Sequence, residues 1–86
     1  MQIKTTKTFD EEYHSLPERI KKQANKQISF LLEDLHHPSL RAKKLKGKED
    51  IWEARVTRDY RLTFQIIGNT YLLRRIGKHE EILRKP

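Results

Sequence analysis

The stretch IWEARVTRDYRLTFQIIGNTYLLRRI, residues 51–76, decides the fold of this 86-residue chain. Apolar and polar residues alternate along it with a period of two, which is typical of strands with one buried face. Gly68 and Asn69 interrupt the alternation, and glycine readily adopts the positive φ that a type II′ turn requires at its first central position. The expected strands, joined by two hairpins, cover residues 51–57, 61–67 and 70–76.

Counting outward from the two turns predicts which side chains share a face of this sheet. The predicted cross-strand pairs are Phe64 with Leu73, Thr63 with Arg74, Arg61 with Ile76, Val56 with Leu62, and Arg55 with Thr63. The apolar face, which helices should cover, contains Trp52, Val56, Leu62, Phe64, Tyr71 and Leu73. The polar face contains Glu53, Arg55, Arg61, Thr63 and Arg74. Several charged groups therefore gather on one side of the sheet.

The N-terminal part of the chain predicts a short edge strand and a first helix. Residues 2–7 alternate weakly, as a short strand does. Thr8 followed by Glu11 fits a capping box, in which the hydroxyl and the carboxylate accept hydrogen bonds from amides that a helix start leaves unbonded. This pattern predicts a helix over residues 9–15.

A longer helix is predicted over residues 17–35, where apolar residues recur every three or four positions. Pro17 suits a helix start because its missing N–H has no partner to lose there. Pro38 cannot continue a helix and restricts the residue before it, so the helix should end near His36. We therefore expect an α+β fold, with two N-terminal helices packed on one face of a small, mostly antiparallel twisted sheet.

Length and composition limit the classes of function. A chain of 86 residues makes one domain, residues 1–86, with a thin core. The absence of cysteine excludes disulfides and cysteine-based zinc sites, and no apolar run approaches the ~18 residues of a membrane span. We expect a cytoplasmic protein that makes no membrane contact. The net charge of +7 attracts nucleic acid, although many basic domains bind only other proteins.

A basic connector covers residues 38–50, with Leu40 and Leu45 as its apolar anchors. It is either a solvated linker or a rim that binds phosphate groups. Tyr60 either stacks on a base or packs in the ordinary way. The candidates for RNA binding are Lys44, Lys46, Lys48, Arg58, Tyr60, Arg74 and Lys78.

The candidates for catalysis are Arg55, Arg61, Asp59 and His79. His79 is out of phase with the polar face, but Gly77 suits a bulge that would turn the imidazole onto it. Cleavage of RNA by an adjacent 2′-hydroxyl needs a proton acceptor, an acid for the departing 5′-oxygen and cations for the charge on phosphorus. His79 would be the general acid or base, the arginines would stabilise the phosphorane, and Asp59 would orient the histidine or accept the 2′ proton. This chemistry demands no metal and no cofactor.

A structural explanation of the same residues stays open. In that case His79 is an exposed residue at a strand end, and the two arginines pair with Glu53 and Asp59. Ion pairs that only stabilise a fold concentrate charge in the same way.

Four segments together resemble the RelE/ParE superfamily of toxin components. They are Leu45-Lys46-Gly47, residues 51–56, Asp59-Tyr60-Arg61-Leu62 and residues 75–83. The resemblance covers nearly the whole chain and implies a RelE-like fold. It also implies a type II toxin that acts as a ribosome-dependent mRNA endonuclease, an mRNA interferase, on mRNA in the ribosomal A site. The implied partner is a cognate antitoxin, and an acidic, partly disordered segment of it would suit the charge of this chain.

The resemblance also implies roles for single residues. It gives functional roles to Arg55, Arg61 and the residue after Gly77-Lys78, which is His79 here, as in the YafQ-like branch. The acidic-aromatic pair of that branch matches Asp59 and Tyr60. Two positions depart from the pattern: Arg55 stands where YafQ-like members have histidine, and Glu53 stands where RelE has lysine.

Two other functions remain open from the sequence. The ParE branch inhibits DNA gyrase by protein binding, which needs no general acid. A catalytically inactive module that binds RNA or regulates would also keep the fold.

Overall fold

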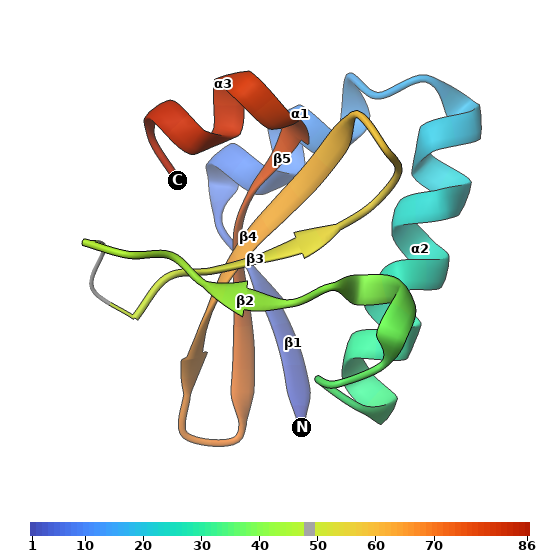
Figure 1. Cartoon of the computed structure of the whole chain (residues 1–86). Helices are drawn as coiled ribbons and strands as arrows, with labels where there is room; N and C mark the ends of the chain where they lie inside the picture. The colour runs from blue at the N-terminus through green and yellow to red at the C-terminus, as the bar shows by residue number, and fades with distance from the viewer. Residues whose placement is uncertain (48–49) are drawn as a thin grey trace.

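Within residues 1–47 and 50–86, which the computed structural model describes, five strands form one sheet in the order β1-β5-β4-β3-β2 (Figure 1). The strands are β1 (Gln2–Thr5), β2 (Lys43–Lys44), β3 (Trp52–Arg55), β4 (Tyr60–Ile67) and β5 (Thr70–Lys78). The helices are α1 (Lys7–His14), α2 (Glu18–Glu33), the short 3₁₀ helix η1 (Pro38–Leu40) and α3 (His79–Arg84). The pair β1 and β5 is parallel, and the other three strand pairs are antiparallel.

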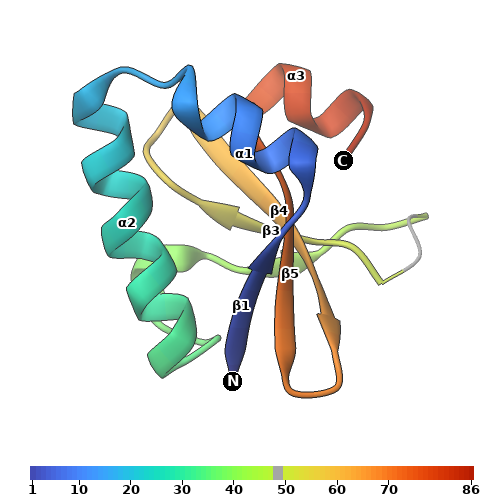
Figure 2. The ribbon, with the colours of Figure 1, turned by 180° about the vertical axis from the view of Figure 1, so that it is seen from behind.

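Helices α1 and α2 cover one face of this sheet, whereas α3 lies on the other side from α1 (Figure 2). The residues predicted for the apolar face form the core under α1 and α2. Of these, Val56, Leu62, Phe64, Tyr71 and Leu73 are buried, and Trp52 is half-buried and stacks on Phe64. The predicted α+β class, with a mostly antiparallel sheet, is confirmed.

Helix α1 begins earlier than predicted, because Thr6 caps it instead of Thr8. The Thr6 hydroxyl accepts a hydrogen bond from the Phe9 N–H at 3.0 Å and donates one to the carbonyl of Arg74 at 2.7 Å. The cap therefore also ties α1 to β5. A capping pattern uses only residues near the helix start, so it does not include a partner as distant in the chain as Arg74. The capping-box prediction was therefore wrong in position.

Helix α2 is held to the sheet by a buried polar side chain, Gln27. Its amide nitrogen donates to the carbonyls of Ser39 (3.1 Å) and Arg55 (2.8 Å), and its amide oxygen accepts from the Ser39 hydroxyl (2.9 Å). These bonds join α2, η1 and the end of β3. Gln27 therefore fixes the point at which the chain leaves β3.

The first hairpin differs from the predicted register by two residues. Arg55 pairs with Arg61 instead of Thr63, and Glu53 pairs with Thr63. The reason is that the connection between β3 and β4 is longer than predicted. The Val56 N–H closes this connection by donating a hydrogen bond to the carbonyl of Tyr60 at 3.0 Å. A shift of two residues leaves every side chain on its predicted face.

The second hairpin has the predicted turn but a bulge in an unexpected place. Gly68 has a φ of 59°, and the predicted pair Phe64 with Leu73 is confirmed. The register then shifts by one residue, so that the partners of Thr63 and Arg61 are Arg75 and Gly77 instead of the predicted Arg74 and Ile76.

The bulge lies at Arg74 and not at Gly77 as predicted. Its physical cause is the burial of both Leu73 and Ile76, which are three residues apart. Strict alternation would put one of them on the polar face, whereas one extra residue lets both enter the core.

The C-terminal segment also differs from prediction, because His79 begins a helix instead of ending a strand. The fully buried Ile82 of this helix lies over Gly77, where an added Cβ would come within 3.3 Å of it. After α3 the chain folds back, and the main-chain oxygen of Pro86 accepts a hydrogen bond from the buried Thr63 hydroxyl at 2.8 Å. The centre of the polar sheet face is therefore covered.

In the part of the chain that the structure describes, no helix combines the length and the apolar character needed to cross a membrane.

The Gln27 bonds generate a prediction about stability. Gln27→Leu leaves the carbonyls of Ser39 and Arg55 without this donor, so the free energy of unfolding should fall by about 2 kcal/mol. Urea unfolding measures the change. Gln23→Leu, on the exposed side of the same helix, is the matched control and should change stability by less than about 0.5 kcal/mol. Equal effects of the two variants would contradict this role of Gln27.

A second prediction concerns alkaline pH. Burial, together with the nearby charge of Asp34, raises the pKa of Tyr71 above the ordinary value of 10.0. The folded state therefore keeps this proton to higher pH than the unfolded state, and its stabilising effect is complete below pH 10.0 and lost as the pH rises through the folded-state pKa. In urea unfolding across alkaline pH, Tyr71→Phe should lose stability less steeply than the original chain.

Candidate functional site

Two connections of the chain meet at one end of the sheet. The first is the turn between β3 and β4, and the second is the passage from β5 into α3. Tyr60 pairs with Lys78, and the His79 N–H donates a hydrogen bond to the carbonyl of Asp59 at 2.8 Å. These main-chain contacts bring the Asp59-Tyr60 pair beside the Lys78-His79 pair.

A hollow of about 350 Å³ lies at this junction. It is lined by Arg58, Asp59, Tyr60, Lys78, His79, Glu80 and Glu81. Five of the residues predicted for catalysis or RNA binding therefore surround one space. His79 is half-buried there, and Asp59 is exposed. Among the described residues, Asp59 contacts His79 through its main chain, with no hydrogen bond between the carboxylate and the imidazole.

Arg61 lies next to this hollow and is held by many partners. Its Nη1 atom donates to the carbonyls of Thr57 (2.7 Å), Arg58 (2.8 Å) and Tyr60 (3.0 Å). Its Nε atom lies 3.5 Å from Oε1 of the buried Glu53. Arg61 therefore fastens the turn that carries Asp59 and Tyr60.

Arg55 is the direct cross-strand neighbour of Arg61 but has a different environment. It is half-buried, and its guanidinium group forms no ion pair or hydrogen bond with another described residue, although its carbonyl accepts a hydrogen bond from Gln27. Among the described residues its guanidinium group therefore keeps its donors for an anion. The two arginines share one face, as predicted, but they are not equally available.

The other predicted RNA-binding residues lie elsewhere. Lys44, on the edge strand β2, pairs with Asp50 at 2.9 Å, and Lys46 is exposed in the following turn. Lys48 lies outside the described residues. Arg74 lies at the bulge of β5, where its Nη1 donates to Oε1 of Gln65 at 2.9 Å. The described part of the basic connector thus contains η1 and β2 and does not line the hollow.

Sequence reasoning missed the two acidic residues of the hollow, Glu80 and Glu81. They were missed because the segment after Gly77 was not predicted to be helical. A signal was present, since two acidic residues in a first turn followed by an apolar residue are typical of a helix start. For metal binding, the described parts of the chain contain no group of three or more His, Cys, Asp or Glu residues that could hold an ion.

The sequence model of the ParE-like toxin domain matches residues 18–84, which include every residue that lines the hollow. The chain belongs to the ParE-like toxin domain family. The predicted membership of the RelE/ParE toxin superfamily is therefore confirmed. No curated protein matches the sequence.

Solved structures of the superfamily share the fold of this ParE-like chain. A chain of the RelB-RelE antitoxin-toxin complex from Methanococcus jannaschii has a TM-score of 0.78 and 24% identity, covering 96% of this chain and 99% of its own. YafQ from E. coli strain BL21(DE3) has a TM-score of 0.80 and 16% identity, with 94% and 96% covered. The YoeB/ParE toxin from Agrobacterium tumefaciens has a TM-score of 0.80 and 18% identity, with 92% and 99% covered.

The contacts of Arg61 predict an asymmetry between two variants. Arg61→Gln leaves the Glu53 carboxylate buried without a cation and should lower the free energy of unfolding by about 3 kcal/mol. Glu53→Gln leaves Arg61 bonded to three carbonyls and should lower it by only about 1 kcal/mol. Chemical denaturation of the two variants measures the difference. Equal losses, or the reverse order, would show that the carbonyl contacts do not hold Arg61.

Proposed function

We propose that this ParE-like domain is the toxin of a type II toxin-antitoxin system and acts as an mRNA interferase. It cleaves mRNA in the ribosomal A site and so inhibits translation. The reaction is attack of the adjacent 2′-hydroxyl on the phosphodiester, without a metal ion.

One observation carries this proposal: the hollow gathers an imidazole, two cations and three carboxylates, and Arg55 and Arg61 lie opposite each other on the strands β3 and β4, whose connection lines it. Transfer of the 2′ proton and protonation of the departing 5′-oxygen need a group that exchanges protons near neutral pH, and imidazole does so. The negative charge that develops on phosphorus needs fixed cations. The side chains around this hollow supply both requirements.

The proposed role of each residue follows from its position and from the hydrogen-bond donors that its side chain has left. His79 acts as general acid or base, because it is the one histidine among those that line the hollow. Arg55 binds the reacting phosphate, since no described residue occupies its guanidinium group. Arg61 stabilises the same charge through the donors that its carbonyl partners leave unused. Asp59 orients the imidazole or accepts the 2′ proton.

The RNA backbone on either side of the reacting phosphate contacts the remaining basic residues, and Tyr60 stacks on a base. Lys78 and Arg58 line the hollow itself, Lys44, Lys46 and Arg74 lie outside it, and Lys48, which is not among the described residues, is proposed for the same role from the sequence. Arginine matches phosphate oxygens through its planar fork, whereas lysine provides a point charge.

A cognate antitoxin is the proposed protein partner. The structures with this fold include toxin-antitoxin complexes of RelB and RelE from Methanococcus jannaschii, E. coli and Pyrococcus horikoshii. The net charge of +7 favours an acidic, partly disordered antitoxin segment, because opposite charge accelerates association and disfavours unrelated basic partners.

The proposal predicts a specific loss of activity. His79→Ala should lower mRNA cleavage by at least about 100-fold, because general acid-base catalysis contributes that much or more. The measurements are growth arrest on expression and primer extension on mRNA after brief induction. His14→Ala, an exposed histidine on α1, is the matched control and should leave both unchanged. Undiminished toxicity of the folded His79→Ala protein would remove His79 from the mechanism.

Inhibition of DNA gyrase is the second candidate, because the family is named for ParE. The same induced cells distinguish the two activities. An mRNA interferase produces new 5′ ends at defined codon positions, whereas gyrase poisoning produces DNA breaks. DNA breaks without new mRNA ends would replace the first proposal by the second.

A further inference from the structure

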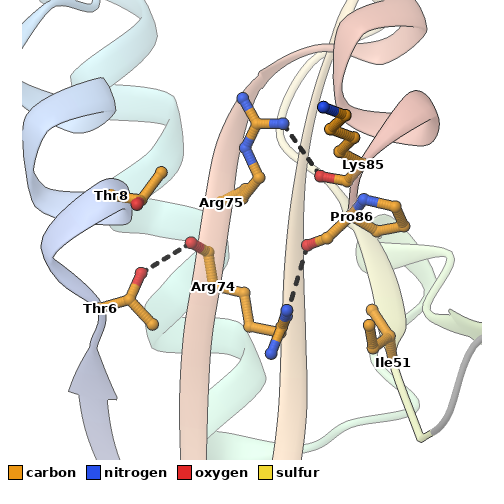
Figure 3. A pocket seen from close by; sticks show the side chains of 7 residues that line it. All are labelled: Thr6, Thr8, Ile51, Arg74, Arg75, Lys85 and Pro86. Carbon is orange, nitrogen blue, oxygen red and sulfur yellow. Dashed lines mark hydrogen bonds between the residues drawn. The ribbon is translucent and has the colours of Figure 1, made fainter.

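A second hollow, of about 370 Å³, lies beside the end of the C-terminal segment (Figure 3). It is lined by Thr6, Thr8, Ile51, Arg74, Arg75, Lys85 and Pro86. The first hollow includes the start of α3, and the second includes the residues that follow the end of α3. Six helical residues rise by about 9 Å, so the two hollows are separated by roughly the length of this short helix.

Positive charge is concentrated around the second hollow. Three of its residues are cations. Within residues 1–47 and 50–86, one carboxylate bonds to them, that of Glu12, which pairs with Arg75. The hydrogen bonds that Arg75 donates to the Glu12 carboxylate raise the pKa of Arg75, so its guanidinium group stays charged. Arg75 also donates to the carbonyl of Lys85 at 2.9 Å, as Figure 3 shows. Arg75 is therefore a structural link between α1 and the C-terminal segment.

The other two cations retain capacity for a ligand. Lys85 is exposed, and its ammonium group forms no ion pair with any described residue. Arg74 uses Nε for the main-chain oxygen of Pro86, at a long 3.4 Å, and Nη1 for Gln65. Its Nη2 atom makes no hydrogen bond within residues 1–47 and 50–86. Like charges gathered in a concave site repel each other until an anion enters.

The other residues that line the second hollow suit a ligand larger than a simple ion. Ile51 and Pro86 form an apolar wall beside the cations, and the Thr8 hydroxyl adds a donor that no described residue occupies. The Thr6 hydroxyl is already used, because it caps α1 and donates to Arg74. Cationic groups next to an apolar wall match the phosphate and the base or sugar of one nucleotide.

We propose that the second hollow binds one nucleotide of single-stranded RNA outside the cleavage position. Arg74 and Lys85 contact its phosphate, and Ile51 and Pro86 contact its sugar or base. This assignment rests on the proposed function for the choice of RNA as the polyanion. It makes α3 the element over which the RNA passes between its two binding sites.

The test uses a labelled single-stranded oligonucleotide with 2′-O-methyl groups throughout, which the chain cannot cleave. Fluorescence anisotropy at several salt concentrations gives the affinity and its salt dependence. Lys85→Gln combined with Arg74→Gln should weaken binding about tenfold. It should also reduce the slope of log K against log salt by about 0.7, the value for one phosphate contact on a single strand.

Two controls make the result specific. Lys22→Gln, an exposed lysine on α2, removes the same type of charge and should leave affinity and slope unchanged. Lys85→Gln alone is the safeguard for folding, because only the main chain of Lys85 takes part in a structural hydrogen bond. It should weaken binding in the same direction as the double variant.

The remaining outcomes overturn the proposal. If Lys85→Gln and the double variant bind the oligonucleotide like the original chain, the hollow does not bind RNA. If they lose affinity for a poly-glutamate peptide but keep affinity for the oligonucleotide, the hollow binds an acidic protein segment instead. Primer extension with His79→Ala tests the mRNA interferase independently, so the nucleotide site can fail while the proposed function stands.

Discussion

Two arginines face each other across β3 and β4, and the end of the sheet that carries the candidate site is built around this pair. Like charges directly opposite each other destabilise an antiparallel pair, so the structure must offset them. It does so for Arg61 alone, with three carbonyls and the buried Glu53. The guanidinium donors of Arg55 stay unbonded among the described residues, because the three carbonyls and Glu53 bond Arg61 instead. The same contacts hold the turn that brings Asp59 to the main chain of His79.

The C-terminal segment completes this arrangement by covering the polar sheet face. Ile82 packs over Gly77, and Pro86 accepts a hydrogen bond from Thr63, so Thr63 and Glu53 become buried although they lie on the polar face. One Glu53 oxygen has no hydrogen-bond partner among the described residues. The ion pair between Glu53 and Arg61 therefore matters for stability, because a charge left alone in the protein interior is costly. Helix α3 thus stabilises the site and also separates the two hollows.

Much of the sheet could be predicted from sequence because side chains in strands alternate with a period of two. The predicted faces are correct although the predicted register of the first hairpin was wrong by two residues, since an even shift leaves each side chain on the same face. The turn at Gly68 and the pair Phe64 with Leu73 were also predicted correctly. The bulge was misplaced to Gly77, because a local rule about glycine was used where the burial of Ile76 together with Leu73 decided the position. Helix α3 was missed altogether, although its two acidic residues followed by the buried Ile82 are a local signal of a helix start.

The sequence by itself determined the α+β class, the two faces of the sheet up to the bulge in β5 and the grouping of Arg55 with Arg61, because these depend on periodicity and on turns that are local in the chain. Only the tertiary structure decided which candidates meet. It put His79 beside Asp59 and Tyr60 in one hollow, placed Arg74 near a second one, and divided the arginines into a bonded Arg61 and an available Arg55. The physical reason is that these outcomes depend on hydrogen bonds and packing between segments that are far apart in the chain, which no local pattern encodes.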